Sequence, residues 1–83
     1  MSRREKLLER LRRTTVRARA DDVALALEGS GWRLTGQSGS HVRWQHGTGG
    51  RPIVYPLVQG RWVKVVYVRQ ILKRLDDDDS ESA

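Results

Sequence analysis

The segment His41–His46 alternates between two kinds of side chain, and glycine-rich turns bracket it on both sides. Successive side chains of a strand point to opposite faces, so one face carries Val42, Trp44 and His46 and the other His41, Arg43 and Gln45. The chain enters through Gly36–Ser40 and leaves through Gly47–Gly50, and such turns join antiparallel strands. The segment therefore predicts the second of three antiparallel strands, with His41 and Arg43 pointing outward together.

Strands are predicted on both sides of this segment. Residues 32–34 indicate a short strand before it, and residues 52–58 a third strand after it. Pro56 places the third strand at an edge or at a bulge, because proline lacks the N–H that a ladder needs. Trp32 and Trp44 are the predicted core anchors of so small a domain, whereas Trp62, between Arg61 and Lys64, is free to stack on an unpaired base.

The N-terminal part predicts two helices. Leu7, Leu8 and Leu11 recur at helical spacing within residues 3–13, and residues 14–20 follow as a linker. Asp21 and Asp22 supply an N-terminal cap and first-turn negative charge for a helix to about residue 28. The predicted buried side of that helix draws on Val23, Leu25, Ala26 and Leu27.

The C-terminal part predicts a last helix and a tail. Residues 62–67 are ambiguous, because their β-branched side chains favour a strand. Helical spacing of apolar residues predicts a helix over residues 66–75, at Val68, Ile71, Leu72 and Leu75. Residues 76–83, rich in aspartate, are predicted to be disordered. The order of elements is helix, helix, three antiparallel strands, helix, which is an α+β fold.

The chain has 83 residues and no cysteine, which leaves room for one small core and no disulfide framework. We therefore expect a single domain over residues 1–75, in which residues 1–19 form the N-terminal helix and linker. No secretory leader is visible, and no run approaches the roughly 18 apolar residues of a membrane span. These features predict a cytoplasmic protein without a membrane partner.

Basic residues dominate residues 1–75, which hold all sixteen Lys and Arg side chains but only five of the ten acidic ones. A surface this basic is typical of a nucleic-acid binder. An anionic membrane surface is the weaker interpretation, and solubility alone is the simplest one.

His41 is the candidate for chemistry on such a polyanion. Histidine ordinarily titrates near pH 6.5, so it can take or give a proton near neutrality, and Gly39 permits close approach of a backbone or substrate. A solvated residue at a strand end, after a simple turn glycine, is the alternative. His46 lies on the opposite face and is interpreted as structural or exposed. Metal catalysis is disfavoured, because the acidic residues before the tail all fall on predicted helices, and no cofactor is expected.

Several motifs in order resemble the HicA-type mRNA interferase toxins, in the longer branch with an extra N-terminal segment. They are Gly31-Trp32, Gly39-Ser40-His41, an aromatic on the next strand and Val68-Arg69-Gln70-Ile71-Leu72, with Arg4–Leu11 and Gln59–Lys64 matching the longer branch. The resemblance covers nearly everything except the acidic tail. It implies a fold like a double-stranded RNA-binding domain, in which a three-stranded antiparallel sheet packs against two helices.

The resemblance also implies a function, namely ribosome-independent cleavage of mRNA, neutralised by a HicB-type antitoxin that covers the active site. The essential histidine of the family corresponds to His41. RNA contacts are then expected from Gly39, Ser40, Arg43, Arg33, Trp62, Lys64 and Arg69. Two positions depart from the family pattern, since Ser38 replaces a basic residue and the pattern before the last helix becomes Lys64-Val65-Val66-Tyr67.

Other functions fit the same residues. A non-catalytic RNA-binding module, or a degenerate and inactive toxin, would bind RNA through the same sheet and helices without cutting it. A small interaction protein would use its basic face to dock an acidic partner. RNA cleavage that depends on His41 would distinguish the mRNA-cleaving toxin from these alternatives.

Overall fold

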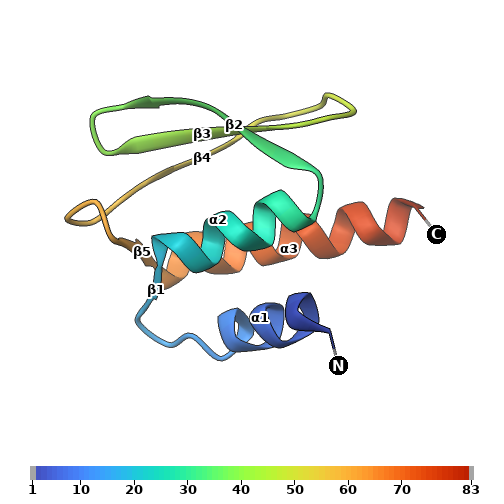
Figure 1. Cartoon of the computed structure of the whole chain (residues 1–83), viewed down its shortest axis with the longest axis horizontal. Coiled ribbons are helices and arrows are strands. Elements are labelled where there is room, and N and C mark those ends of the chain that lie inside the picture. Colours follow the sequence, from blue (N-terminus) through green and yellow to red (C-terminus); the bar gives the residue numbers. More distant parts are fainter. Residues whose placement is uncertain (1, 83) are drawn as a thin grey trace.

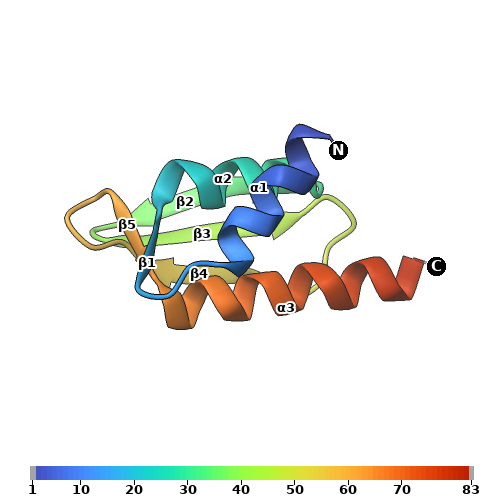
Figure 2. The same ribbon diagram turned by 90° about the horizontal axis from the view of Figure 1, so that it is seen from below.

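The computed structural model describes residues 2–82, with side chains for residues 2–77. Its elements follow in the order α1 (Arg3–Arg12), β1 (Arg17–Arg19), α2 (Ala20–Gly29), β2 (Trp32–Ser38), β3 (His41–His46), β4 (Ile53–Pro56), β5 (Trp62–Lys64) and α3 (Val65–Ser82). The main sheet forms one layer, α2 and α3 lie under one of its faces, and α1 lies beneath both helices (Figures 1 and 2). None of the described helices covers the opposite face of the sheet.

The main sheet is antiparallel with the strand order β2-β3-β4, so β3 is central, as the alternation in residues 41–46 predicts. β2 is longer than predicted, because the strand continues to Ser38 and confines the turn to Gly39 and Ser40. The register shifts between Leu34 and Gly36, which leaves Thr35 as the extra residue of a β-bulge. The three-stranded sheet and the α+β class are thus confirmed.

A second, two-stranded sheet pairs β1 with β5 and is absent from the prediction, which made residues 14–20 a linker. Ala18 and Val63 pair at its centre and are both buried. Neither three-residue strand is recognisable alone, because each is stabilised by a partner more than forty positions away in the sequence. The pairing also resolves the ambiguous segment: residues 62–64 form a strand, and the helix begins at Val65.

The starts of α1 and α2, and the buried side of α2, can be compared with the prediction. α1 is capped by Ser2, whose Oγ accepts a hydrogen bond from the Glu5 N–H at 3.1 Å. α2 begins one residue before Asp21, without a side-chain cap, so the two aspartates occupy its first turn. Leu25 is 57% exposed, contrary to its predicted burial, because α2 buries the stripe at Val23, Ala26 and Leu27, and residue 25 lies off it.

The core lies between the sheet and α2, α3 and α1, and it contains both predicted tryptophan anchors, Trp32 and Trp44, each 3% exposed. The indole Nε1 of Trp44 donates a hydrogen bond to the hydroxyl of Tyr55, on the neighbouring strand, at 3.0 Å. Buried polar atoms need such partners, since an unpaired one loses its hydration without compensation. The pair therefore fixes β3 against β4 from inside the core.

This buried hydroxyl predicts a loss of stability at high pH. Burial raises the pKa of Tyr55 to about 12, although the hydrogen bond from Trp44 lowers it in part. Because the folded pKa lies above the unfolded value near 10, the stabilisation is complete below about pH 10 and is lost as the pH rises towards 12. We expect the free energy of unfolding to fall by about 2 kcal/mol between about pH 9 and pH 11.5.

Urea denaturation followed by circular dichroism measures this decrease. Tyr55→Phe has no hydroxyl to ionise, so its stability should depend less on pH over the same interval. An equally steep decline in Tyr55→Phe would assign the effect to other groups.

α3 continues through the aspartates to Ser82, whereas their composition predicts disorder from residue 76. A helix that is already nucleated extends at little cost, because each added residue contributes a backbone hydrogen bond. Asp76 also accepts an ion-pair contact from Arg12 of α1, 3.2 Å away. Ala83, the last residue of the predicted tail, lies outside the described residues. None of the described helices has the length and apolar character needed to cross a membrane.

Candidate functional site

The uncovered face of the main sheet carries the outward side chains of β3, namely His41, Arg43 and Gln45, all outside the core. His41 lies opposite Ser38 of β2 and Pro56 of β4, and Arg43 lies opposite Gly36 and Val54. Residues that pair across antiparallel strands share a face, so these four partners flank His41 and Arg43 on the same face. We call this surface the outer face.

The turn before β3 positions His41 at the end of the sheet. Gly39 has φ +59°, a left-handed conformation that glycine adopts without the strain of a side chain. The carbonyl of Ser40 accepts a hydrogen bond from the Leu57 N–H at 2.7 Å, which ties the turn to the residue after β4. The side chains of Ser40 and His41 are both exposed. The turn is therefore anchored through its backbone and leaves the His41 imidazole accessible.

A shallow hollow of about 390 Å³ lies beside His41, between the end of β2 and β4. Arg43 and Val54 line it together with His41. Gly36, opposite Arg43, has no side chain and leaves space there. His41 and Arg43 are two residues apart on one strand, which separates their attachment points by about 7 Å. An imidazole and a guanidinium thus border one hollow that is open to solvent.

Arg33 also points to the outer face, since it pairs with Gln45, but it lies at the other end of β3 from His41. The three remaining predicted RNA contacts, Trp62, Lys64 and Arg69, lie on β5 and α3. The structure thus divides the predicted contacts into an outer-face group and a β5–α3 group. The start of α3, β5 and the turn before β3 occupy the same end of the molecule (Figures 1 and 2).

Trp62 is half-buried and carries the guanidinium of Arg17 4.0 Å from its ring centroid. Arg17 was not predicted as a site residue, because the linker interpretation of residues 14–20 hid its pairing with Lys64. A cation over an indole gains electrostatic stabilisation from the ring. Arg17, Trp62 and Lys64 therefore form a compact basic and aromatic cluster on the small sheet.

His46 is structural, as its position on the inner face predicts. Its Nδ1 accepts a hydrogen bond from the Thr48 N–H at 3.2 Å, and its Nε2 lies 3.1 Å from the Ser30 carbonyl, which places the ring proton on Nε2. The ring stands edge-on to Trp32, with centroids 5.2 Å apart. Gly31, at φ +89°, permits this packing, because a Cβ there would lie 3.0 Å from Nε2. Through these contacts, His46 holds β3 against the junction between α2 and β2.

Comparison with known protein families gives a match. A family model described as "HicA toxin of bacterial toxin-antitoxin" matches residues 20–76, from the start of α2 into α3. The matched span includes the whole main sheet, the turn before β3 and His41, and it excludes α1. Searches of curated proteins and of solved structures gave no match.

Proposed function

We propose, since this chain belongs to the HicA toxin family of bacterial toxin–antitoxin systems, that it is an endoribonuclease that cleaves mRNA without a metal ion. In this proposal His41 is the catalytic residue. The observation that supports it most directly is the exposed imidazole at the end of the uncovered sheet face, beside Arg43 and the open hollow.

The proposed reaction is a transesterification, in which the phosphoryl group passes from the 5′-oxygen of one nucleotide to the 2′-oxygen of the nucleotide before it. A base removes the proton of a ribose 2′-hydroxyl, the 2′-oxygen attacks the adjacent phosphorus, and an acid protonates the departing 5′-oxygen. The products are a 2′,3′-cyclic phosphate and a free 5′-hydroxyl. His41 performs one of the two proton transfers, a role typically worth about 10² to 10⁴ in rate. Arg43 stabilises the charge that develops on the phosphorane.

The remaining contacts bind the RNA on either side of the reaction. Gly39 and Ser40 let the phosphate approach the backbone of the turn, and Arg33 extends the basic track along the outer face. Lys64 and Arg69 bind phosphates at the β5–α3 end. Trp62 stacks on an unpaired base, and such stacking contributes about 1 to 3 kcal/mol per base.

A HicB-type antitoxin is the proposed protein partner. The outer face is uncovered, basic and carries the half-exposed Val54, 48% of whose surface is accessible. A partner that covers this face would bury His41 and exclude RNA. The antitoxin would therefore neutralise the toxin by occupying its substrate site, in the cytoplasm where mRNA is available.

A cleavage assay in excess EDTA tests the proposed reaction. We expect the purified chain to cut a defined mRNA in EDTA as well as in magnesium, and to leave fragments with cyclic phosphate ends. Coexpression with a cognate antitoxin should remove the activity. Cleavage that disappears in EDTA would contradict the metal-independent mechanism.

One observation favours a second candidate, an RNA-binding module or inactive toxin. Ser38 pairs directly with His41, so the nearest cross-strand side chain on β2 is uncharged where the family has a basic residue. One phosphate contact beside the histidine is thereby missing. Salt-sensitive RNA binding without any cleavage would support this alternative.

A further inference from the structure

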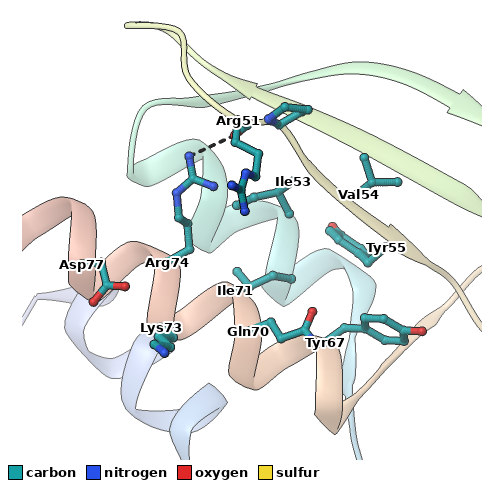
Figure 3. Close-up of a pocket in the computed structure, with 11 residues that line it drawn as sticks. Arg51, Ile53, Val54, Tyr55, Tyr67, Gln70, Ile71, Lys73, Arg74 and Asp77 are labelled. Carbon is teal, nitrogen blue, oxygen red and sulfur yellow. Dashed lines mark hydrogen bonds between the residues drawn. The ribbon is translucent and has the colours of Figure 1, made fainter.

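A groove of about 340 Å³ runs between β4 and α3, outside the site described above (Figure 3). Its floor is apolar, because Ile53 of β4 and Ile71 of α3 line it and are at most 9% exposed. Tyr67 lies at one end of the groove and is half-buried, so part of its ring stays accessible. Arg51, Lys73 and Arg74 provide the positive charge.

The two arginines are arranged differently. Arg74 donates a hydrogen bond from Nη2 to the carbonyl of Arg51 at 3.0 Å, and its guanidinium lies 5.1 Å from the centroid of the Trp32 ring. The exposed Arg51 side chain points into the groove toward Ile53 (Figure 3). Arg74 is thus a fixed cation, whereas Arg51 is the more accessible one. A groove with an aromatic ring at one end and arginines toward the other suits a nucleotide, which offers a base to stack and a phosphate to bind.

The free edge of β4 is poorly suited to a protein strand. The hydrogen bond from Leu57 to Ser40 makes those residues a bonded pair, and bonded and non-bonded pairs alternate along antiparallel strands. The backbone groups of residues 54 and 56 therefore point away from β3, as would those of residue 52. Positions 52 and 56 are prolines without an N–H, which leaves Val54 as the only donor of the three.

Val54 connects this groove with the outer face. It lines the hollow beside His41 and also the groove between β4 and α3. It lies opposite Arg43 in the sheet register. A chain that crosses the outer face at His41 and Arg43 therefore reaches the groove by passing over a single strand.

We propose that the groove between β4 and α3 binds one unpaired nucleotide of the RNA strand that crosses the outer face. Its base stacks on Tyr67, with Gln70 as a hydrogen-bonding neighbour, and its phosphate binds Arg51. Stacking requires an unpaired base, so the substrate is single-stranded at this point. Asp77 and Lys73 border the other end of the groove. This inference rests on the proposed function, because it assumes that the outer face binds RNA.

Fluorescence anisotropy with a labelled 2′-O-methyl RNA of about ten nucleotides tests the assignment, since that RNA lacks the attacking 2′-hydroxyl. We expect Arg51→Gln and Tyr67→Leu each to weaken binding about fivefold or more. Arg51→Gln should also reduce the slope of log affinity against log salt by about 0.7, the value for one phosphate contact on a single strand. Tyr67→Leu should leave that slope unchanged. Arg3→Gln removes one exposed charge from α1 and should have neither effect.

The outcomes separate this inference from the proposed function. If Arg43→Gln weakens binding but Arg51→Gln and Tyr67→Leu do not, RNA uses the outer face alone and the inference is wrong. If the oligonucleotide does not bind the wild-type protein, the proposed function fails as well. If an acidic peptide binds in a way that depends on Arg51 while RNA does not, the groove is a protein-docking site instead. Circular dichroism checks folding, and Gln70→Ala, at an exposed position, replaces Tyr67→Leu if that variant is unfolded.

Discussion

His41→Ala should lower the rate of RNA cleavage by about 10²- to 10⁴-fold, the contribution of one positioned proton-transfer group. The imidazole is exposed and lies outside the buried core, so the variant should keep its fold. Exposed substitutions away from caps and turns usually change the free energy of unfolding by less than about 0.5 kcal/mol. Its affinity for 2′-O-methyl RNA should stay close to the wild-type value. A cleavage time course on a defined mRNA, with anisotropy in parallel, measures both quantities.

His46 provides a matched control. His46→Ala removes the hydrogen bonds to Ser30 and Thr48 and the edge contact with Trp32, so it should lower thermal stability. It should nevertheless retain cleavage at a temperature where it is folded. Equal activity of His41→Ala and the wild type would remove His41 from the mechanism. Loss of RNA binding in His41→Ala would instead make this residue a substrate contact.

Which side chains of β3 face the core could be predicted, because this property depends only on the local sequence. Alternation along residues 41–46 places Val42 and Trp44 in the core and His41 and Arg43 on the outer face, whichever strands pair with them. The same alternation placed His46 on the inner face. The missing N–H of Pro56 predicted an edge position or a bulge, and β4 is an edge strand. The exposure of the candidate catalytic residue could therefore be predicted from alternation, whereas its catalytic role is what the family resemblance implies.

The positions of the basic side chains relative to one another could not be predicted from local sequence patterns. Lys64 and Trp62 were predicted to contact RNA along with Arg43 and Arg33, but β5 belongs to a separate sheet formed with β1. That pairing depends on a contact between distant segments, and neither segment is long enough to show a period. The groove between β4 and α3 has the same origin, because its two walls come from elements far apart in the chain. Charge composition indicates how basic a surface is, and only the fold indicates which cations are neighbours.

Trp44→Ala should have the largest effect on stability. The side chain is 3% exposed at the centre of the main sheet, and large-to-small replacement of a buried tryptophan costs about 3 to 5 kcal/mol. The change also leaves the buried Tyr55 hydroxyl without its hydrogen-bond donor, which adds about 1 to 3 kcal/mol. Small domains have total stabilities of about 5 to 15 kcal/mol. We therefore expect Trp44→Ala to be largely unfolded at 37 °C, as measured by urea denaturation and circular dichroism.

Trp62→Ala tests whether this effect comes from burial or merely from the loss of an indole. Trp62 is only half-buried and supports Arg17 on the small sheet, so its removal should cost far less stability while weakening RNA binding. Trp44→Phe, which keeps an aromatic ring but not the N–H, should lie between wild type and Trp44→Ala. If Trp62→Ala unfolds the protein as fully as Trp44→Ala, Trp62 belongs to the core and its proposed stacking on RNA is wrong. The two tryptophans differ in burial, which predicts a structural role for Trp44 and leaves the Trp62 ring partly accessible for the proposed stacking on RNA.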